Sequence, residues 1–145
     1  MQILVNQSLK WTKSDEDYRK DQIIEKYESK EIKTLKFKQT NNSDYIIELY
    51  ENGLKRNEGL LIDNKEEGLW KHYYSNGSPS LHVTFKQGKI DGRIFEVDSL
   101  GGVRFVGNQI MGKLEGFTTY FFEDGTIRKQ GEYKNGKQVG KWIRN

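Results

Sequence analysis

The sequence predicts an all-β protein, an elongated antiparallel meander of repeated β-hairpins that forms a single twisted sheet. The first observation is a lattice of glycines: fourteen of the fifteen recur at intervals of 24 residues. The second is that segments of six to eight residues, rich in aromatic and β-branched side chains, lie between these glycines, as strands do. The third is the dipeptide Asn-Gly or Asp-Gly at 52–53, 76–77 and 124–125, the strongest short signal for a hairpin turn.

The glycines form four columns with a period of 24 residues. The columns are Gly68, Gly92, Gly116 and Gly140; Gly53, Gly77, Gly101 and Gly125; Gly88, Gly112 and Gly136; and Gly59, Gly107 and Gly131, with Val83 in the remaining place. A fixed period of this length indicates an array in which each repeat packs against its neighbours.

One repeat, residues 68–91, shows the expected elements. We predict a strand over 69–74, a turn at Asn76-Gly77, a strand over 80–86 and a second turn at Gly88-Lys89. The Asn-Gly turn is expected to be type I′, which needs positive φ at both central residues. The motif Gly-Lys-x-x-Gly is expected to be a loop whose last glycine ends the loop and starts the next strand.

The repeats account for the whole chain as one domain, residues 1–145. Residues 44–145 hold four clear repeats, and 1–43 hold degenerate repeats that cap the array. The meander should contain about eleven or twelve strands. Residues 14–31 begin with a capping-box pattern but have no helical apolar stripe, so a strand is preferred there over a helix. Beyond Tyr45, no helix longer than about two turns is expected.

Composition limits the function classes. The chain has 24 basic and 21 acidic residues, and this near balance argues against nucleic-acid binding. It has no cysteine, which excludes disulfides and thiolate chemistry. The longest apolar run near the N-terminus is too short for a signal peptide or a membrane span, so we expect a cytoplasmic protein.

The residues that could carry chemistry are sparse. His72 and His82 lie on adjacent predicted strands, and two histidines are too few for a metal site. Asp91 and Glu115 share a loop column and are expected to be solvated, whereas a catalytic pair would face each other in a cleft. We therefore expect no enzyme activity, no catalytic residues, no metal and no cofactor.

Aromatic side chains are the strongest candidates for binding. Neither face of the predicted sheet is cleanly polar, so either the sheet curls on itself or one face is kept for a partner. We predict partner contacts on the face that carries the first-strand positions of the central repeats, with the Phe95, Phe117 and Phe121 side as the next candidate. The predicted residues are Trp70, His72, Tyr74, Glu96, Asp98, Tyr120 and Phe122.

A column of lysines follows the Gly-Lys turns, one in each repeat. It consists of Lys65, Lys89, Lys113 and Lys137, and it would line one long edge of the array. Such a column could contact the phosphates of an anionic membrane. The competing interpretation is that these lysines serve turns and solubility, because Glu66, Glu67, Asp91 and Glu115 dilute their potential.

The turn glycines, the Gly-Lys-x-x-Gly motif and the aromatic strand positions together resemble MORN repeats, and "GEYKNGKQVGKW" (131–142) carries the pattern best. The 24-residue period and the Tyr-x-Asn-Gly turns resemble the bacterial variant of that repeat, over about residues 44–145. The pattern departs at Asn64, where a turn glycine is missing, and at Val83.

The resemblance implies a function as well as a fold. The bacterial variant is common in antitoxin and immunity proteins of polymorphic toxin systems. It therefore implies a non-catalytic module that neutralises a cognate toxin domain by steric occlusion. MORN repeats also occur in membrane-junction scaffolds, in lipid kinases and beside methyltransferase domains. The alternative expectation is therefore a scaffold that binds an anionic membrane surface through the lysine column.

Overall fold

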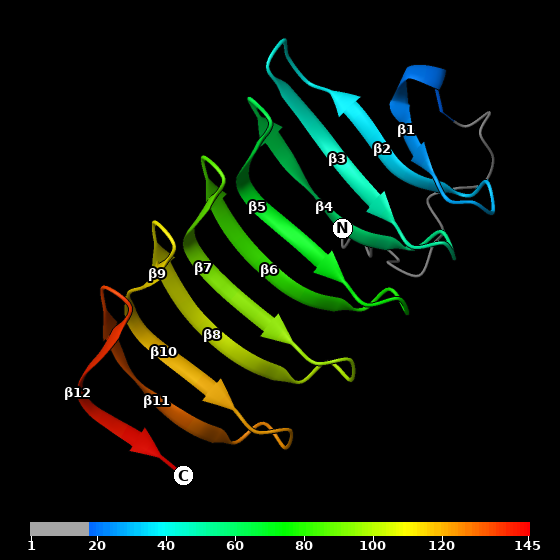
Figure 1. Cartoon of the computed structure of the whole chain (residues 1–145). Helices are drawn as coiled ribbons and strands as arrows, with labels where there is room; N and C mark the ends of the chain where they lie inside the picture. Colours follow the sequence, from blue (N-terminus) through cyan, green and yellow to red (C-terminus); the bar gives the residue numbers. More distant parts are fainter. Residues whose placement is uncertain (1–17) are drawn as a thin grey trace, which may run out of the picture.

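The computed structural model describes residues 18–145 and shows one open antiparallel sheet in which strands adjacent in sequence are adjacent in space (Figure 1). This confirms the predicted all-β meander. A three-residue 3-10 helix, η2 (Lys20–Gln22), precedes the sheet. The twelve strands are β1 (Ile23–Lys26), β2 (Ile32–Lys38), β3 (Ser43–Leu49), β4 (Lys55–Ile62), β5 (Lys65–Tyr73), β6 (Pro79–Lys86), β7 (Lys89–Val97), β8 (Val103–Ile110), β9 (Lys113–Leu114), β10 (Gly116–Phe121), β11 (Ile127–Lys134) and β12 (Lys137–Arg144).

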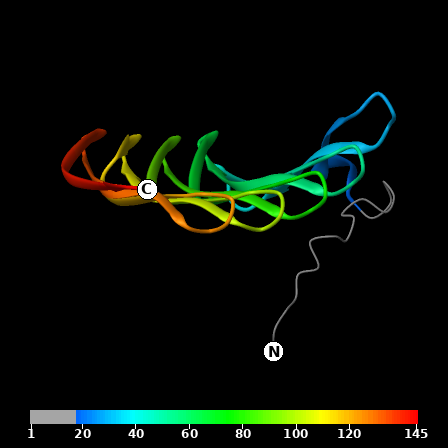
Figure 2. The same ribbon diagram turned by 90° about the horizontal axis from the view of Figure 1, so that it is seen from below.

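The sheet is a trough rather than a flat layer, because the hairpin ends on one long edge curl to one side (Figure 2). We call the side that carries Trp70, Val83 and Ile94 the inner face and the opposite side the outer face. These three side chains pair across β5, β6 and β7 and are buried.

The turns on the two edges of the sheet differ in geometry. At Gln87-Gly88 both residues have positive φ (51° and 78°), and the turns at 63–64, 111–112 and 135–136 on the same edge share this type I′ feature. At the Asn76-Gly77 turn only Gly77 has positive φ (88°), and the Gly77 N–H donates to the Tyr74 carbonyl. The prediction of a type I′ turn at Asn76-Gly77 is therefore wrong. This turn is a three-residue loop that ends in a left-handed glycine.

The missing turn glycine at Asn64 is also explained. Asp63 and Asn64 have φ of 50° and 60°, so they adopt the same type I′ turn without glycine. Asn and Asp tolerate this left-handed conformation better than other side chains do, because their short polar groups can bond locally.

The last glycine of Gly-Lys-x-x-Gly was expected to end a loop and start a strand, and this holds only at Gly116, the first residue of β10; at the other three positions of its column the glycine lies inside a strand. Gly68 lies inside β5 with φ of 71°, and Gly92 lies inside β7 with φ of 129°. Positive φ inside a strand bends it. The glycines therefore curl the strands into the trough, and the bend at Gly116 separates β9 from β10.

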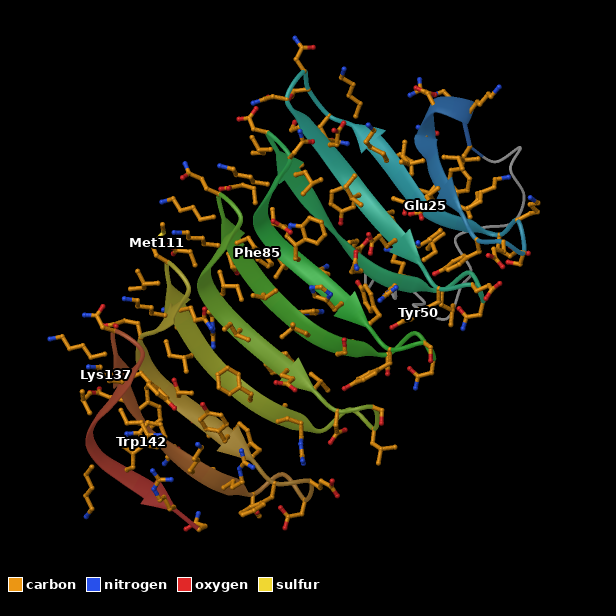
Figure 3. All side chains as sticks on the ribbon, in the orientation of Figure 1. Glu25, Tyr50, Phe85, Met111, Lys137 and Trp142 are labelled. Carbon is orange, nitrogen blue, oxygen red and sulfur yellow. The ribbon has the colours of Figure 1, made fainter. Side chains whose placement is uncertain are left out.

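Two glycines of a further column make room for tryptophan on the inner face. A Cβ at Gly59 would overlap the indole of Trp70, and a Cβ at Gly131 would overlap that of Trp142. Val83 replaces glycine where the next strand carries Ile94 instead of an indole. Trp142 and Phe85, which lie on this face, are labelled in Figure 3.

The core changes faces near the N-terminal end. Leu35, Ile47 and Leu49 are buried on the outer face, with Tyr18 and Ile23 packed against them. The strand preferred over a helix within residues 14–31 is confirmed for β1. Residues 14–17 lie outside the described part. Within residues 18–145 no helix is long and apolar enough to cross a membrane.

Candidate functional site

Three of the predicted contact residues lie in one row across the inner face. Continuous strand register places His72, Glu96 and Tyr120 on alternate strands of that row, with Leu81 and Phe105 between them. The full row from β4 to β12 is Asn57, His72, Leu81, Glu96, Phe105, Tyr120, Lys129 and Arg144. The structure therefore brings together residues from repeats that are 24 positions apart.

Trp70 shares this face but belongs to the core. Its side chain is only 8% exposed, and its indole N–H donates to the Leu60 carbonyl at 3.1 Å. A side chain so deeply packed offers a partner little surface. The burial of Trp70 therefore does not support the prediction that it contacts a partner.

The other three predicted residues stand at the turns on the opposite edge from the lysine column. The Tyr74 hydroxyl donates to the Val97 carbonyl of the next hairpin at 2.8 Å, as Tyr50 does to the Tyr73 carbonyl. The Asp98 carboxylate instead accepts the N–H groups of Leu100 and Gly102 in its own turn. Tyr74 and Asp98 thus have structural partners already.

Phe122, the last of the seven, is exposed on this edge. Its ring lines an open depression together with Arg104, Glu123, Asp124 and Thr126. Arg104 lies 4.0 Å from Asp98 and 3.9 Å from Glu123, so its charge is only loosely paired.

The outer face carries the apolar side chains that remain exposed. Leu69 is 50% exposed on β5, Phe95 is 38% exposed on β7 and Phe117 is 60% exposed on β10. The Phe95 ring lies 6.5 Å from that of His82, which pairs with it across the sheet. This is the side that the sequence placed second, and large exposed apolar groups on a folded surface often mark a contact with a partner.

A buried polar cluster was not anticipated from the sequence. Glu58 is 6% exposed and accepts hydrogen bonds from Lys55 Nζ at 2.7 Å and from the Tyr73 hydroxyl at 2.8 Å. Burial and the Glu58 carboxylate raise the pKa of Tyr45 to about 12, and the same causes raise the pKa of Tyr73 further. No periodic signal could reveal this cluster, because the equivalents of Glu58 are His82, Val106 and Gln130.

The loop carboxylates have a structural role that the sequence reading missed. Asp91 and Glu115 were expected to be solvated, but Glu115 accepts the N–H of Asn135 at 2.7 Å and Asp91 that of Met111 at 3.4 Å. The Glu67 carboxylate likewise accepts a hydrogen bond from the N–H of Gln87, in the next turn on the same edge of the sheet. These carboxylates couple each repeat to the next.

The two histidines lie on opposite faces of the sheet. His72 pairs with Leu81, and His82 pairs with Lys71, so their rings project to different sides. Burial lowers the pKa of both imidazoles. Within residues 18–145, no three His, Cys, Asp or Glu side chains gather closely enough to hold a metal ion.

The lysine column lies along the curled edge of the sheet. Lys65, Lys89, Lys113 and Lys137 are each the first residue of a strand, and all four are exposed. Lys137 and Met111 mark this edge in Figure 3, on the opposite side from Tyr50. Ile110 and Met111 form an exposed apolar tip beside Lys113.

No model of a known protein family matches this chain, and no curated protein sequence matches it.

Proposed function

We propose that the protein is a non-catalytic protein-binding module, an immunity or antitoxin protein that neutralises a bacterial toxin by covering it. The observation that carries this proposal is the uncovered apolar surface of the outer face, with Leu69, Phe95 and Phe117 exposed on alternate strands. We call these three side chains the outer apolar patch.

The architecture suits occlusion better than it suits catalysis. Each central strand is paired on both sides, so the outer apolar patch is held on a stiff platform and loses little conformational entropy on binding. Large side chains displayed in this way are the usual anchors of protein interfaces. The resemblance to bacterial MORN repeats supplies the kind of partner, a toxin domain.

The proposed contact surface differs from the one expected on the inner face. There Trp70 is buried, and Tyr120 is packed against Phe105 with 4.9 Å between the ring centroids. On the outer face, by contrast, the only aromatic contact of Phe95 among the described residues is with the tilted His82 ring. Phe117 has no aromatic contact among these residues. The outer face therefore offers more uncovered apolar area.

The experiment co-expresses this protein with the proteins encoded by its neighbouring genes and measures growth rescue and complex affinity. We expect one of these proteins to arrest growth alone and to bind this protein. The double variant Phe95→Ser/Phe117→Ser should weaken that complex by about 2 kcal/mol or more and abolish rescue.

Two results would contradict this proposal at different levels. A matched inner-face variant, His72→Ala/Glu96→Lys, controls for general damage and should retain rescue. If the inner-face variant alone abolishes rescue, the contact surface is the inner face. If no neighbouring gene product is toxic and bound, the immunity function itself is wrong.

A second candidate function has a specific observation of its own. The exposed tip Ile110-Met111 lies on the same edge as the lysine column, an arrangement suited to an anionic membrane surface. Sedimentation with anionic liposomes at low salt tests this function. Changing Lys65, Lys89, Lys113 and Lys137 to Glu should abolish binding, since each lysine contributes about 1 kcal/mol there. Failure of the wild-type protein to sediment would exclude the membrane function.

A further inference from the structure

The positive charge of this near-neutral chain is concentrated at its C-terminal end. Residues 127–145 contain six basic residues and one acidic residue, Glu132, a net charge of +5. The whole chain has 24 basic and 21 acidic residues, so the first 126 residues have 18 and 20, a net charge of −2. The overall charge of +3 therefore conceals a local basic surface.

On the inner face, two of these cations are direct cross-strand partners. Lys129 on β11 pairs with Arg144 on β12, and like charges in this position repel each other. Neither forms an ion pair with any other residue in the described part of the chain. An anion bound between them would relieve the repulsion.

Aromatic rings beneath the cations hold them in place. Lys129 Nζ lies 4.2 Å from the centre of the Tyr120 ring and 5.9 Å from that of Trp142. Arg144 Cζ lies 5.8 Å from the Trp142 ring, and Arg128 Cζ lies 5.6 Å from the Tyr120 ring. We call Arg128, Lys129 and Arg144, with Tyr120 and Trp142, the basic–aromatic cluster.

Polar contacts orient one side of this cluster and leave donors free. Arg144 Nη2 donates to Gln138 Oε1 at 3.0 Å, and Gln138 Nε2 donates to the Tyr133 hydroxyl at 3.3 Å. The remaining guanidinium N–H groups of Arg144 and the ammonium of Lys129 have no acceptor among the described residues. These donors could bind a carboxylate together.

The other repeats show that the fold does not require this arrangement. At the position of Arg144 the earlier repeats have His72, Glu96 and Tyr120, and at the position of Lys129 they have Asn57, Leu81 and Phe105, paired in the same way. The same strand pair therefore forms without two cations. Their presence in the last repeat calls for a reason other than folding.

The geometry also distinguishes between classes of anionic partner. Single-stranded nucleic acids stack their bases on open aromatic faces. Here cations lie over Tyr120 and Trp142, and the edges of Phe105 and Tyr133 pack against the same two rings. The cluster therefore presents positive charge and hydrogen-bond donors rather than a stacking platform.

We propose that the basic–aromatic cluster binds a carboxylate-rich segment of a partner protein. The site lies on the inner face at the C-terminal end of the sheet, whereas the outer apolar patch lies on the opposite face. This inference goes beyond the proposed function, and either can fail without the other.

The test measures binding of a hexaglutamate peptide to the full chain at low salt by calorimetry. Hexalysine, oligouridylate and inorganic phosphate serve as comparison probes. We expect hexaglutamate to bind more tightly than the other three. Lys129→Gln/Arg144→Gln should weaken hexaglutamate binding about tenfold or more, because charge-assisted hydrogen bonds are lost. The variant should fold, since it removes a like-charge pair.

A charge-matched control separates this site from general attraction. Lys65→Gln/Lys89→Gln removes the same charge on the curled edge and should weaken binding by about twofold at most. As a measurement independent of any substitution, hexaglutamate should slow chemical acetylation of Lys129 but not that of Lys65. Equal losses in the two double variants, tighter binding of oligouridylate, or no protection of Lys129 would each overturn the proposal.

Discussion

Replacing Glu58 with glutamine tests the buried polar cluster that lies where the core changes from the outer to the inner face. The substitution keeps the size of the side chain and one acceptor for the Tyr73 hydroxyl, which now bonds at 2.8 Å. It removes the negative charge that Lys55 Nζ contacts at 2.7 Å. One charged partner of the ammonium would then be replaced by a neutral one in a largely buried position.

The size of the effect follows from the burial of the two partners. Removing one member of a buried ion pair typically costs about 3–5 kcal/mol. The side chains of Lys55 and Glu58 are 14% and 8% exposed, so the lysine can turn partly toward water. We therefore expect a loss near the lower limit, about 3 kcal/mol, and a melting temperature lower by roughly 10 °C.

Urea unfolding of four proteins measures the effect directly. They are the wild type, Glu58→Gln, Lys55→Met and the double variant. The double variant removes both charges of the pair, so its loss should be smaller than the sum of the two single losses. Ultraviolet titration of tyrosinate should also show a lower pKa for Tyr45, because the Glu58 charge helps to raise it to about 12. A change below about 0.5 kcal/mol in Glu58→Gln would refute the reasoning.

Three further predictions concern turns, packing and pH. Gly77→Val should cost about 1–3 kcal/mol, because a β-branched residue is strained at φ of 88°, and an unchanged melting temperature would contradict this. Gly59→Ala should lower the unfolding free energy more than Gly131→Ala, because the indole over Gly59 is more deeply buried; equal losses would count against the packing argument. The pKa values of His72 and His82 are lower in the folded state than the value of about 6.5 for an unfolded histidine. Below about pH 6.5 the unfolded chain therefore binds more protons than the folded chain does. Stability should fall as pH decreases through that range, and a urea midpoint that is constant between neutral and mildly acidic pH would exclude this coupling.

Strand positions were predictable because turn chemistry is local. The predicted strands 69–74 and 80–86 correspond to β5 and β6, and the 24-residue period repeats this correspondence along the array. The turn types were harder to predict from the sequence. Asn-Gly fits a type I′ turn, but it also fits a three-residue loop with glycine last, and the strand register decides between them.

The choice between faces could not be made from alternation alone. Both Trp70 and Phe95 are aromatic strand residues on adjacent hairpins, yet Trp70 is buried and Phe95 is exposed. The difference arises from curvature, which is set by positive φ at glycines within the strands, such as Gly68. The sequence reading placed those glycines at loop ends, so it could not assign the inner face.

Comparison among the repeats indicates which side chains the fold needs. A column that keeps one residue type, such as the glycines within the strands, performs the same structural task in every repeat. The row that holds His72, Glu96, Tyr120 and Arg144 changes charge and size at each step while the strand pairing continues through it. Folding therefore does not determine the chemistry of this row. Differences between equivalent positions, rather than the repeat itself, are where recognition of a partner can be encoded, and Arg144 beside Lys129 is the largest such difference on the inner face.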